Sequence, residues 1–279
     1  MSITMKKYVD VAFCYDFDGT LAAGNMQEYG FMKRLGILPC DFWAKSDTMA
    51  EKNLADKNLC YMKCMIEVAK IKKKAFRRED FVECGKDITF FKGVEDWFER
   101  INAYALQKGI RVSHYIISSG LQEMVEGTSI AKYFKQIYAS SFMYNEYGEA
   151  DWPSRIVNYT DKTQYLFRIN KGCLDPSDDK VNAPMDLEDR PVPFEHMLYF
   201  GDGDTDVPCM AMVKREGGYS IAVFQPYKKK SKERANRLFN ENRVNIFAPA
   251  DYSAGKKIDR YVKTVINKIA ADSKLNDFK

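Results

Sequence analysis

The sequence predicts an α/β fold, a Rossmann-like parallel sheet with helices on both faces and an inserted helical segment. Apolar runs typical of buried strands alternate with amphipathic stretches of helical period along most of the chain. Between residues 25 and 86 this alternation gives way to a helical pattern rich in Met, Lys and aromatic residues. A length of 279 residues with 46% hydrophobic content allows one large domain, or a core with such an insertion.

Each expected helix or strand follows from the local spacing of apolar residues and from the turn residues beside it. The helix after the insertion has Trp97, Phe98 and Ile101 on one face, and Gly109 is its stop signal. A turn at residues 146–148 predicts a hairpin that leaves the sheet. Strands are expected at residues 9–15, 111–117, 136–139, 196–200, 219–224 and 244–247. Further helices are expected near residues 121–134, 162–170, 207–215, 228–240 and 256–271, with a loop at 172–193.

Polar side chains follow several of these strands. The first strand ends in DFDGT, with two carboxylates one residue apart. The second ends in Ser118 and Ser119, Lys162 opens a later helix, and Asp202 and Asp206 lie in GDGDTD after another strand. We expect these groups to converge, because the carboxyl ends of parallel strands meet at one edge of a sheet. Carboxylates, a hydroxyl, helix N-terminal amides and one ammonium suit a phosphate held beside a divalent metal.

The order of these motifs resembles that of the haloacid dehalogenase superfamily, specifically its phosphatase branch. DFDGT, a strand ending in SSG, a lysine that opens a helix and GDGDTD all occur in the family's order. The layout is similar to that of phosphoserine-phosphatase-type enzymes, and the inserted segment looks like the family's small helical cap. The resemblance implies a core of residues 1–22 and 87–279, a cap of residues 23–86, and a magnesium-dependent phosphomonoester hydrolase.

The resemblance also implies a role for each catalytic residue. Asp16 is the expected nucleophile that forms an aspartyl-phosphate, and Asp18 is the general acid and base. Ser118 and Ser119 are expected to bind the phosphate, and Lys162 to offset its charge and that of Asp16. Lys171 and Lys180 are alternatives to Lys162, but Lys162 stands at a helix start, as in the family pattern.

The implied metal site is built from aspartates. Mg²⁺ is expected between Asp16, the backbone carbonyl of Asp18 and Asp202, with Asp206 orienting these ligands. Asp204 is the additional acid of the same loop, and we interpret it as a neighbour of the site. A zinc site at cysteines 60 and 64 is not expected, because the whole chain has only two histidines.

The substrate class stays open at this point. A small soluble phosphate ester is expected, since a small cap closes over its ligand. Phosphoserine-type enzymes place a glutamate near the position of Asn25, and Glu28 replaces it only with a different spacing. They also tend to have a doubled glycine where this chain has Ser119 and Gly120. An amino-alcohol phosphate, a sugar phosphate and a nucleotide all remain possible. The alternatives in function are phosphoryl transfer to a second substrate, as in phosphomutases, and a non-catalytic binding protein on this fold.

Composition and charge limit the binding partners and the cellular location that we expect for the chain. The net charge of +4 comes from 43 basic and 39 acidic residues, so neither nucleic-acid nor membrane binding is expected. The basic run at residues 228–237 reads as a solvated helix face. Seven irregularly spaced cysteines without a secretion signal indicate reduced thiols in a cytoplasmic protein. The oligomeric state is left open.

Overall fold

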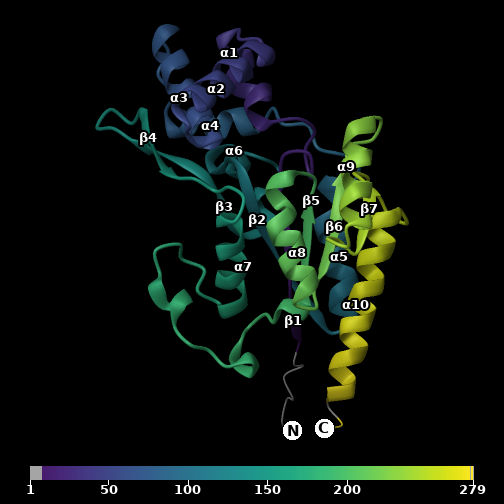
Figure 1. Cartoon of the computed structure of the whole chain (residues 1–279). Coiled ribbons are helices and arrows are strands. Elements are labelled where there is room, and N and C mark those ends of the chain that lie inside the picture. Colours follow the sequence, from purple (N-terminus) through teal and green to yellow (C-terminus); the bar gives the residue numbers. More distant parts are fainter. Residues whose placement is uncertain (1–7, 277, 279) are drawn as a thin grey trace.

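The computed structural model describes residues 8–276 and 278 of the chain. Its centre is a seven-stranded sheet of order β4-β3-β2-β1-β5-β6-β7, in which only β3 and β4 pair antiparallel (Figure 1). The strands are β1 (Val9–Tyr15), β2 (Ile110–Leu121), β3 (Phe134–Tyr144), β4 (Ala150–Arg155), β5 (Met197–Gly201), β6 (Tyr219–Phe224) and β7 (Ile246–Pro249). The expected α/β fold is confirmed.

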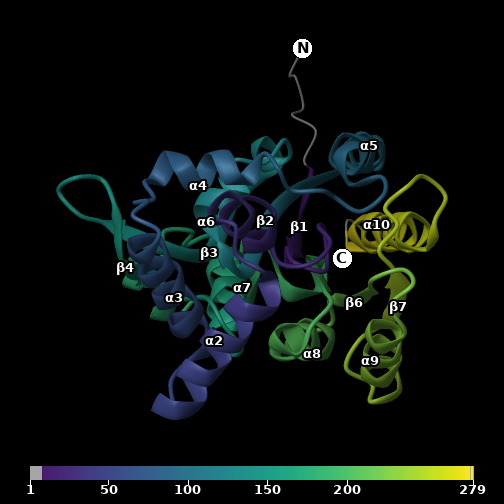
Figure 2. The same ribbon diagram turned by 90° about the horizontal axis from the view of Figure 1, so that it is seen from above.

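Helices cover both faces of this sheet (Figure 2). On one face lie α5 (Val94–Gln107) and α10 (Lys257–Asn276), and on the other α7 (Asp161–Lys171), α8 (Val207–Arg215) and α9 (Lys229–Asn240). Successive residues of β1 enter two different cores, with Phe13 and Tyr15 in one and Ala12 and Cys14 in the other. A strand buried on both faces needs apolar residues at every buried position, which explains the apolar run from Val11 to Tyr15.

The inserted segment folds into helices beyond the carboxyl ends of the parallel strands, at the top of Figure 1. They are a π-helix (Glu28–Met32), α1 (Lys33–Leu35), α2 (Pro39–Asn53), α3 (Lys57–Ile71) and α4 (Arg78–Gly85). Pro39 occupies the first turn of α2, where its missing N–H costs nothing. Asp56 begins α3 by accepting hydrogen bonds from the amides of Asn58 and Leu59 at 2.8 and 3.1 Å. The division into a core and a cap at residues 22 and 86 stays a prediction.

The helix expected at residues 121–134 is present but much shorter than predicted. Strand β2 continues through the SSG motif to Leu121, and α6 (Gln122–Glu126) is only five residues long. At Gly127 the backbone passes so close to α4 that a Cβ atom would lie 1.8 Å from the carbonyl oxygen of Val82. The helix therefore ends where the backbone packs closely against α4, although the local apolar pattern is helical.

The predicted hairpin is present, but it pairs at the edge of the sheet instead of leaving it. Strand β3 is much longer than the expected residues 136–139, and its second half pairs with β4. The hairpin therefore forms the edge of the sheet, and it extends beside α3 (Figure 1).

Within the part of the chain that the structure describes, no helix is both long and apolar enough to cross a lipid bilayer. All seven cysteines are free thiols. Cys60 and Cys64 lie one turn apart on α3, but the group of possible metal ligands found among the described residues consists of aspartates alone.

Candidate active site

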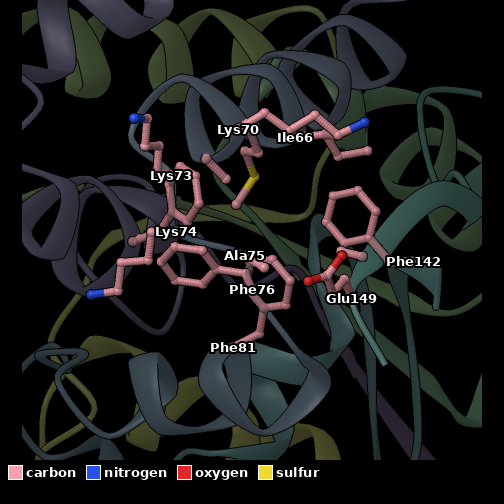
Figure 3. Close-up of a pocket in the computed structure, with 13 residues that line it drawn as sticks. Ile66, Lys70, Lys73, Lys74, Ala75, Phe76, Phe81, Phe142 and Glu149 are labelled. Atoms are coloured by element: carbon pink, nitrogen blue, oxygen red, sulfur yellow. The ribbon is translucent and has the colours of Figure 1, made fainter. Parts of the chain in front are cut away.

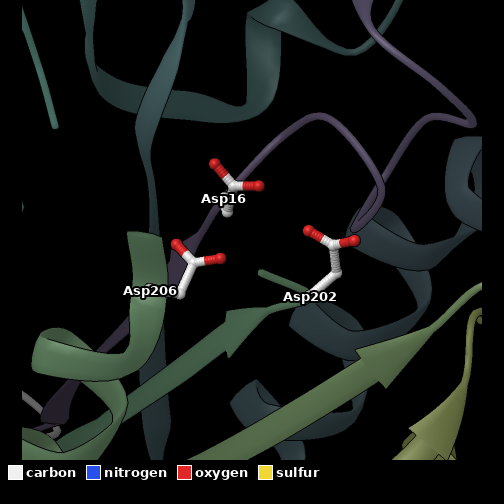
Figure 4. A group of neighbouring side chains, drawn as sticks. All are labelled: Asp16, Asp202 and Asp206. Atoms are coloured by element: carbon white, nitrogen blue, oxygen red, sulfur yellow. The ribbon is translucent and has the colours of Figure 1, made fainter. Parts of the chain in front are cut away.

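Three aspartates from different segments meet at the carboxyl edge of the sheet (Figure 4). Asp16 directly follows β1, Asp202 directly follows β5, and Asp206 precedes α8. One carboxylate oxygen of each lies within 4.8 Å of the others. The structure thus brings together the ends of two motifs that are almost 190 residues apart in the sequence.

Lys162 lies at the centre of this cluster. It belongs to the first turn of α7, is fully buried, and donates to Asp16 Oδ1 at 2.9 Å and to Asp206 Oδ1 at 2.7 Å. The two alternative lysines are elsewhere: Lys171 donates to backbone carbonyls of the loop after α7, and Lys180 is exposed. Lys162 is therefore the lysine of the three that contacts the expected nucleophile.

Both carboxylate oxygens of Asp206 accept hydrogen bonds from protein donors. Its Oδ1 also accepts from the hydroxyl of Tyr199 at 2.8 Å, and its Oδ2 accepts from the amide of Gly203 at 3.1 Å. With both oxygens engaged by protein donors, Asp206 is better placed to orient its neighbours than to bind a metal directly. We call Asp16, Lys162, Asp202 and Asp206 the floor of the site.

The close packing of these groups shifts their pKa values. Burial and the neighbouring Asp206 raise the pKa of Asp16 to about 6, although Lys162 counteracts them. Burial, Asp16 and Asp206 together raise the pKa of Asp202 to about 8. The pKa of Lys162 is raised because the two carboxylates outweigh the opposing effect of burial. The floor carries more negative charge than one ammonium neutralises, so a bound cation would relieve the repulsion.

Asp18 stands at the entrance to the floor. Its Oδ1 accepts from the amide of Met26 at 3.0 Å, and its pKa is well above the usual range because of burial and of Asp16. Gly19, which follows Asp18 in DFDGT, has a φ of +79°, and a Cβ atom there would lie 2.3 Å from Asp202 Oδ2. Only glycine allows this approach of the DFDGT turn to Asp202.

The two serines line a cavity of about 320 Å³ together with Asp16 and Asp18. Ser118 is buried within β2, and its Oγ accepts from the amide of Gly120 at 3.1 Å. Ser119 Oγ is buried and has no hydrogen-bond partner among the described residues. Neither serine caps α6, which begins at Gln122, so the helix start expected at Ser118 is absent and the backbone there belongs to strand β2.

The opposite side of this cavity comes from the inserted segment. Its lining includes Gln27 before the π-helix, Trp43 of α2, and Asn58 and Tyr61 of α3. We call these four residues the roof. The sequence patterns did not single out Gln27 or Asn58, because nothing in their local spacing distinguishes them from other polar residues.

Another residue that the sequence patterns missed is Arg234, on the basic helix α9. Its guanidinium lies 3.4 Å from Asp202 Oδ2, and that of Arg237, one turn later, lies 3.3 Å from Asp204 Oδ1. The basic helix, one face of which was expected only to contact solvent, therefore also forms ion pairs with the loop that carries Asp202 and Asp204. The spacing of three residues, which places both arginines on one helix face, was the available signal.

A second cavity, of about 310 Å³, lies between the inserted segment and the β3–β4 hairpin (Figure 3). Its lining includes the rings of Phe76, Phe81 and Phe142 together with the side chains of Lys70, Lys73 and Lys74. It shares no lining residue with the cavity above the floor. The cavity above the floor is therefore the candidate active site.

The family model for haloacid dehalogenase-like hydrolases matches residues 13–211, which include the whole floor. The chain belongs to this family. An uncharacterized protein of Borreliella burgdorferi is 28% identical over 284 residues, covering 90% of this chain and 95% of the relative.

Two solved structures of the family superpose on the chain. A HAD family hydrolase from Salmonella enterica serovar Typhi has a TM-score of 0.56 at 17% identity, over 81% of this chain and 65% of that one. This chain thus spans slightly less than two thirds of the Salmonella protein. A substrate-bound phosphoserine phosphatase has a TM-score of 0.54 at 14% identity, over 91% of this chain and 98% of the other. At such identities the likeness concerns the fold.

Proposed function

We propose that this chain is a magnesium-dependent phosphomonoester hydrolase that acts through an aspartyl-phosphate. The observation that carries the proposal is the buried contact of Asp16 with Lys162, at the base of a cavity that Asp18 and Ser118 also line. A carboxylate held by a buried ammonium beside a second, protonatable carboxyl is suited to attack on phosphorus. Residues 23–86 would close this cavity as a cap, and a cytoplasmic location remains our expectation.

The reaction follows from the properties of the two aspartates. Asp16, with a pKa of about 6, is ionised near neutral pH and attacks the phosphorus, while the bond to the ester oxygen breaks. Asp18 has a strongly raised pKa, so it holds the proton that the leaving alkoxide takes. Its carboxylate then removes a proton from a water that attacks the aspartyl-phosphate. Inorganic phosphate leaves, and Asp16 and Asp18 return to their starting states.

The remaining residues hold the phosphoryl group and the charges. The hydroxyls of Ser118 and Ser119 are placed in the cavity to bind phosphate oxygens, and Lys162 offsets the charge on Asp16. The floor also fits a magnesium ion, since its ligands are all oxygens and its carboxylates repel one another. Asp16, Asp202 and the carbonyl of Asp18 would hold the ion, with Asp206 orienting them. When bound, it would screen the phosphate from the carboxylates.

Phosphate release from p-nitrophenyl phosphate tests the proposal. We expect release that requires Mg²⁺, stops with chelator, and falls by roughly three orders of magnitude or more in Asp16→Asn. Asp151→Asn changes the same residue type at an exposed site on β4 and should leave the rate unchanged. Release that persists in Asp16→Asn would contradict the proposal. Adding an alcohol acceptor and looking for its phosphate ester distinguishes hydrolysis from phosphoryl transfer.

A further inference from the structure

A buried methionine connects the expected general acid with the strand that carries the two serines. Met26 is fully buried and lies just before the π-helix, where the chain enters the inserted segment. Its amide donates to Asp18 Oδ1 at 3.0 Å, and its Sδ accepts from the amide of Leu121 at 3.0 Å. One residue of the insertion therefore contacts both the DFDGT turn and the end of β2.

Strand β2 leaves room for this side chain at Gly120. A Cβ atom at Gly120 would lie 2.3 Å from Met26 Cε and 2.8 Å from its Sδ. The φ of Gly120 is not positive, so the need for glycine at this position is one of space and not of backbone conformation. A larger residue there would displace the methionine. We therefore attribute the glycine after Ser119 to the packing of Met26.

The hydrogen bond from Met26 also determines how the Asp18 carboxyl is turned. With Oδ1 engaged by the Met26 amide, Oδ2 is the oxygen left to carry a proton. A Cβ atom at Gly120 would lie 3.3 Å from Asp18 Oδ2, so this oxygen faces the end of β2 that follows the two serines. Asp18 is only half-buried and lines the cavity, so a ligand can reach it. A proton on Oδ2 is thus close to the strand expected to bind the phosphate.

Met26 itself does not touch a ligand in the cavity, because it is fully buried and is not part of the cavity lining. Its influence on the reaction therefore passes through Asp18. The amide that holds Asp18 belongs to a residue whose side chain is fixed at its far end by Leu121 and Gly120. A thioether is a weak acceptor, but its flexible chain fills an irregular space well. The side chain thereby fixes the position of the amide.

We propose that Met26 is a positioning residue that orients Asp18 so that Oδ2 faces the ester oxygen of the substrate. This proposal rests on the general-acid role proposed above for Asp18. When Asp16 attacks the phosphorus and the bond from phosphorus to the ester oxygen breaks, that oxygen takes the proton from Asp18 Oδ2. Such transfer depends steeply on geometry, and a misplacement of about 1 Å can cost roughly a hundredfold in rate.

Two aryl esters that share a ring test this assignment. Phenyl phosphate releases a basic phenoxide that needs a proton, whereas 2,4-dinitrophenyl phosphate releases a phenolate that leaves without one. The ratio kcat/KM covers only the steps up to departure of the phenol, so the later hydrolysis of the aspartyl-phosphate does not enter. Met26→Leu should lower kcat/KM roughly tenfold for phenyl phosphate and by less than about twofold for 2,4-dinitrophenyl phosphate.

Met26→Leu nearly conserves volume, so the chain should still fold, which urea denaturation checks, but the amide of Leu121 loses its acceptor. Asp18→Asn should show the same pattern with a larger loss on phenyl phosphate. Met65→Leu makes the same change at another buried methionine, on α3, and should alter neither value. An equal loss on both esters in Met26→Leu would indicate a role in folding or phosphate binding and would overturn the proposal, as would no loss on either.

Gly120→Ala tests the same contact from the strand, and it decides the question if Met26→Leu does not fold. Its added Cβ would displace Met26, so phenyl phosphate should again lose more than the dinitrophenyl ester. Both changes together should cost less than the product of the single losses, because they act through one contact. If the native chain hydrolyses both esters but the variants keep their ratio, the positioning role falls and the phosphatase function stands. If the native chain hydrolyses neither, both fall.

Discussion

At the floor of the cavity, carboxylates surround one buried ammonium, whereas the roof across from them holds amide, hydroxyl and indole groups. Asp47 and Lys57 of the inserted segment also line the cavity, and they pair with each other at 3.0 Å. Both regions bury polar atoms, but they satisfy them differently. Lys162 joins Asp16 and Asp206 by short ionic hydrogen bonds, while two buried acceptors near the cavity have no partner among the described residues. The difference indicates that the floor is preorganised for the phosphoryl group common to all phosphate esters. The roof would then contact the alcohol part of the ester, which differs from one substrate to another.

The largest effect is expected from removing the ammonium of the floor. Lys162→Met leaves Asp16 and Asp206 buried without their cation, so the free energy of unfolding should fall by about 3–5 kcal/mol and phosphatase activity should vanish. Urea denaturation measures the first effect. Lys228→Met, at an exposed position before α9, should stay within about 0.5 kcal/mol of the native chain.

A double variant separates stability from catalysis at the floor. Adding Asp206→Asn to Lys162→Met removes one of the stranded charges, and should restore part of the unfolding free energy but none of the activity. If Lys162→Met alone unfolded with the native free energy, the floor would not be a locked network of charges, and the contrast with the roof would disappear.

A smaller effect is expected from a cation bound at the floor. Mg²⁺ should raise the free energy of unfolding by about 2.7 kcal/mol at one hundred times its dissociation constant. Asp202→Asn should abolish this gain, and in chelator it should be more stable than the native chain, because it removes a carboxylate whose pKa is raised to about 8 by burial, Asp16 and Asp206. Calorimetry with and without chelator measures both changes.

The same loop supplies the control for that experiment. Asp204 is two residues away, and its side chain is 64% exposed. Asp204→Asn should keep the full magnesium-dependent gain in stability. An equal loss of the gain in both variants would mean that general electrostatics of the acidic loop, rather than a site at Asp202, binds the ion.

A network of buried, uncharged polar side chains also lies in the sheet core beneath the floor. It predicts that the free energy of unfolding depends on pH. Within the sheet core, Trp97 donates to the Tyr15 hydroxyl, which pairs with His114 Nδ1 at 3.1 Å, while Asn102 pairs with the other ring nitrogen at 2.9 Å. Burial lowers the pKa of His114 to about 3, against about 6.5 in an unfolded chain. The unfolded state thus binds the proton first, so stability is complete above pH 6.5 and falls as pH drops toward 3.

This contribution amounts to about 2 kcal/mol between pH 6.5 and pH 5. Denaturation at several pH values should show that His114→Gln removes a slope of this size. His196 is only half-buried, so His196→Gln should remove less. If the slope were the same in all three proteins, a charged group rather than this neutral network would control the acid response.

The floor was predictable from the sequence because its residues lie in short contiguous motifs at the ends of strands. An apolar run that stops at DFDGT or GDGDTD marks both the strand and the acid after it, and parallel topology then brings the motifs together. Lys162 was harder to assign because Lys171 and Lys180 follow it closely. Its place at a helix start favoured Lys162, and the structure adds its hydrogen bonds to Asp16 and Asp206.

The roof and part of the fold depend on contacts between distant segments. Gln27 and Asn58 reach the cavity because of how the helices of the insertion pack, and no local period marks such a position. The helix expected at residues 121–134 is only five residues long, and it ends where Gly127 packs closely against Val82 of α4. Tertiary packing thus overrides a local helical pattern here.

The smallest effect is expected at the junction of roof and core. Asn58 donates to the carbonyl of Val157 at 3.1 Å, and Asn158 of the core donates to Asp56 at 3.0 Å, so the start of α3 is fixed to the core by neutral or singly charged hydrogen bonds. Asn58→Ala should cost about 1 kcal/mol of unfolding free energy, because it leaves a buried carbonyl without its donor. It should also raise KM more than it lowers kcat, since the roof loses its position while the floor is intact. Asn53→Ala, on the exposed side of α2, is the matched control and should change neither quantity. A fall in kcat at unchanged KM in Asn58→Ala would mean that roof and floor act as one unit in catalysis, contrary to the separation of roles argued from their charges.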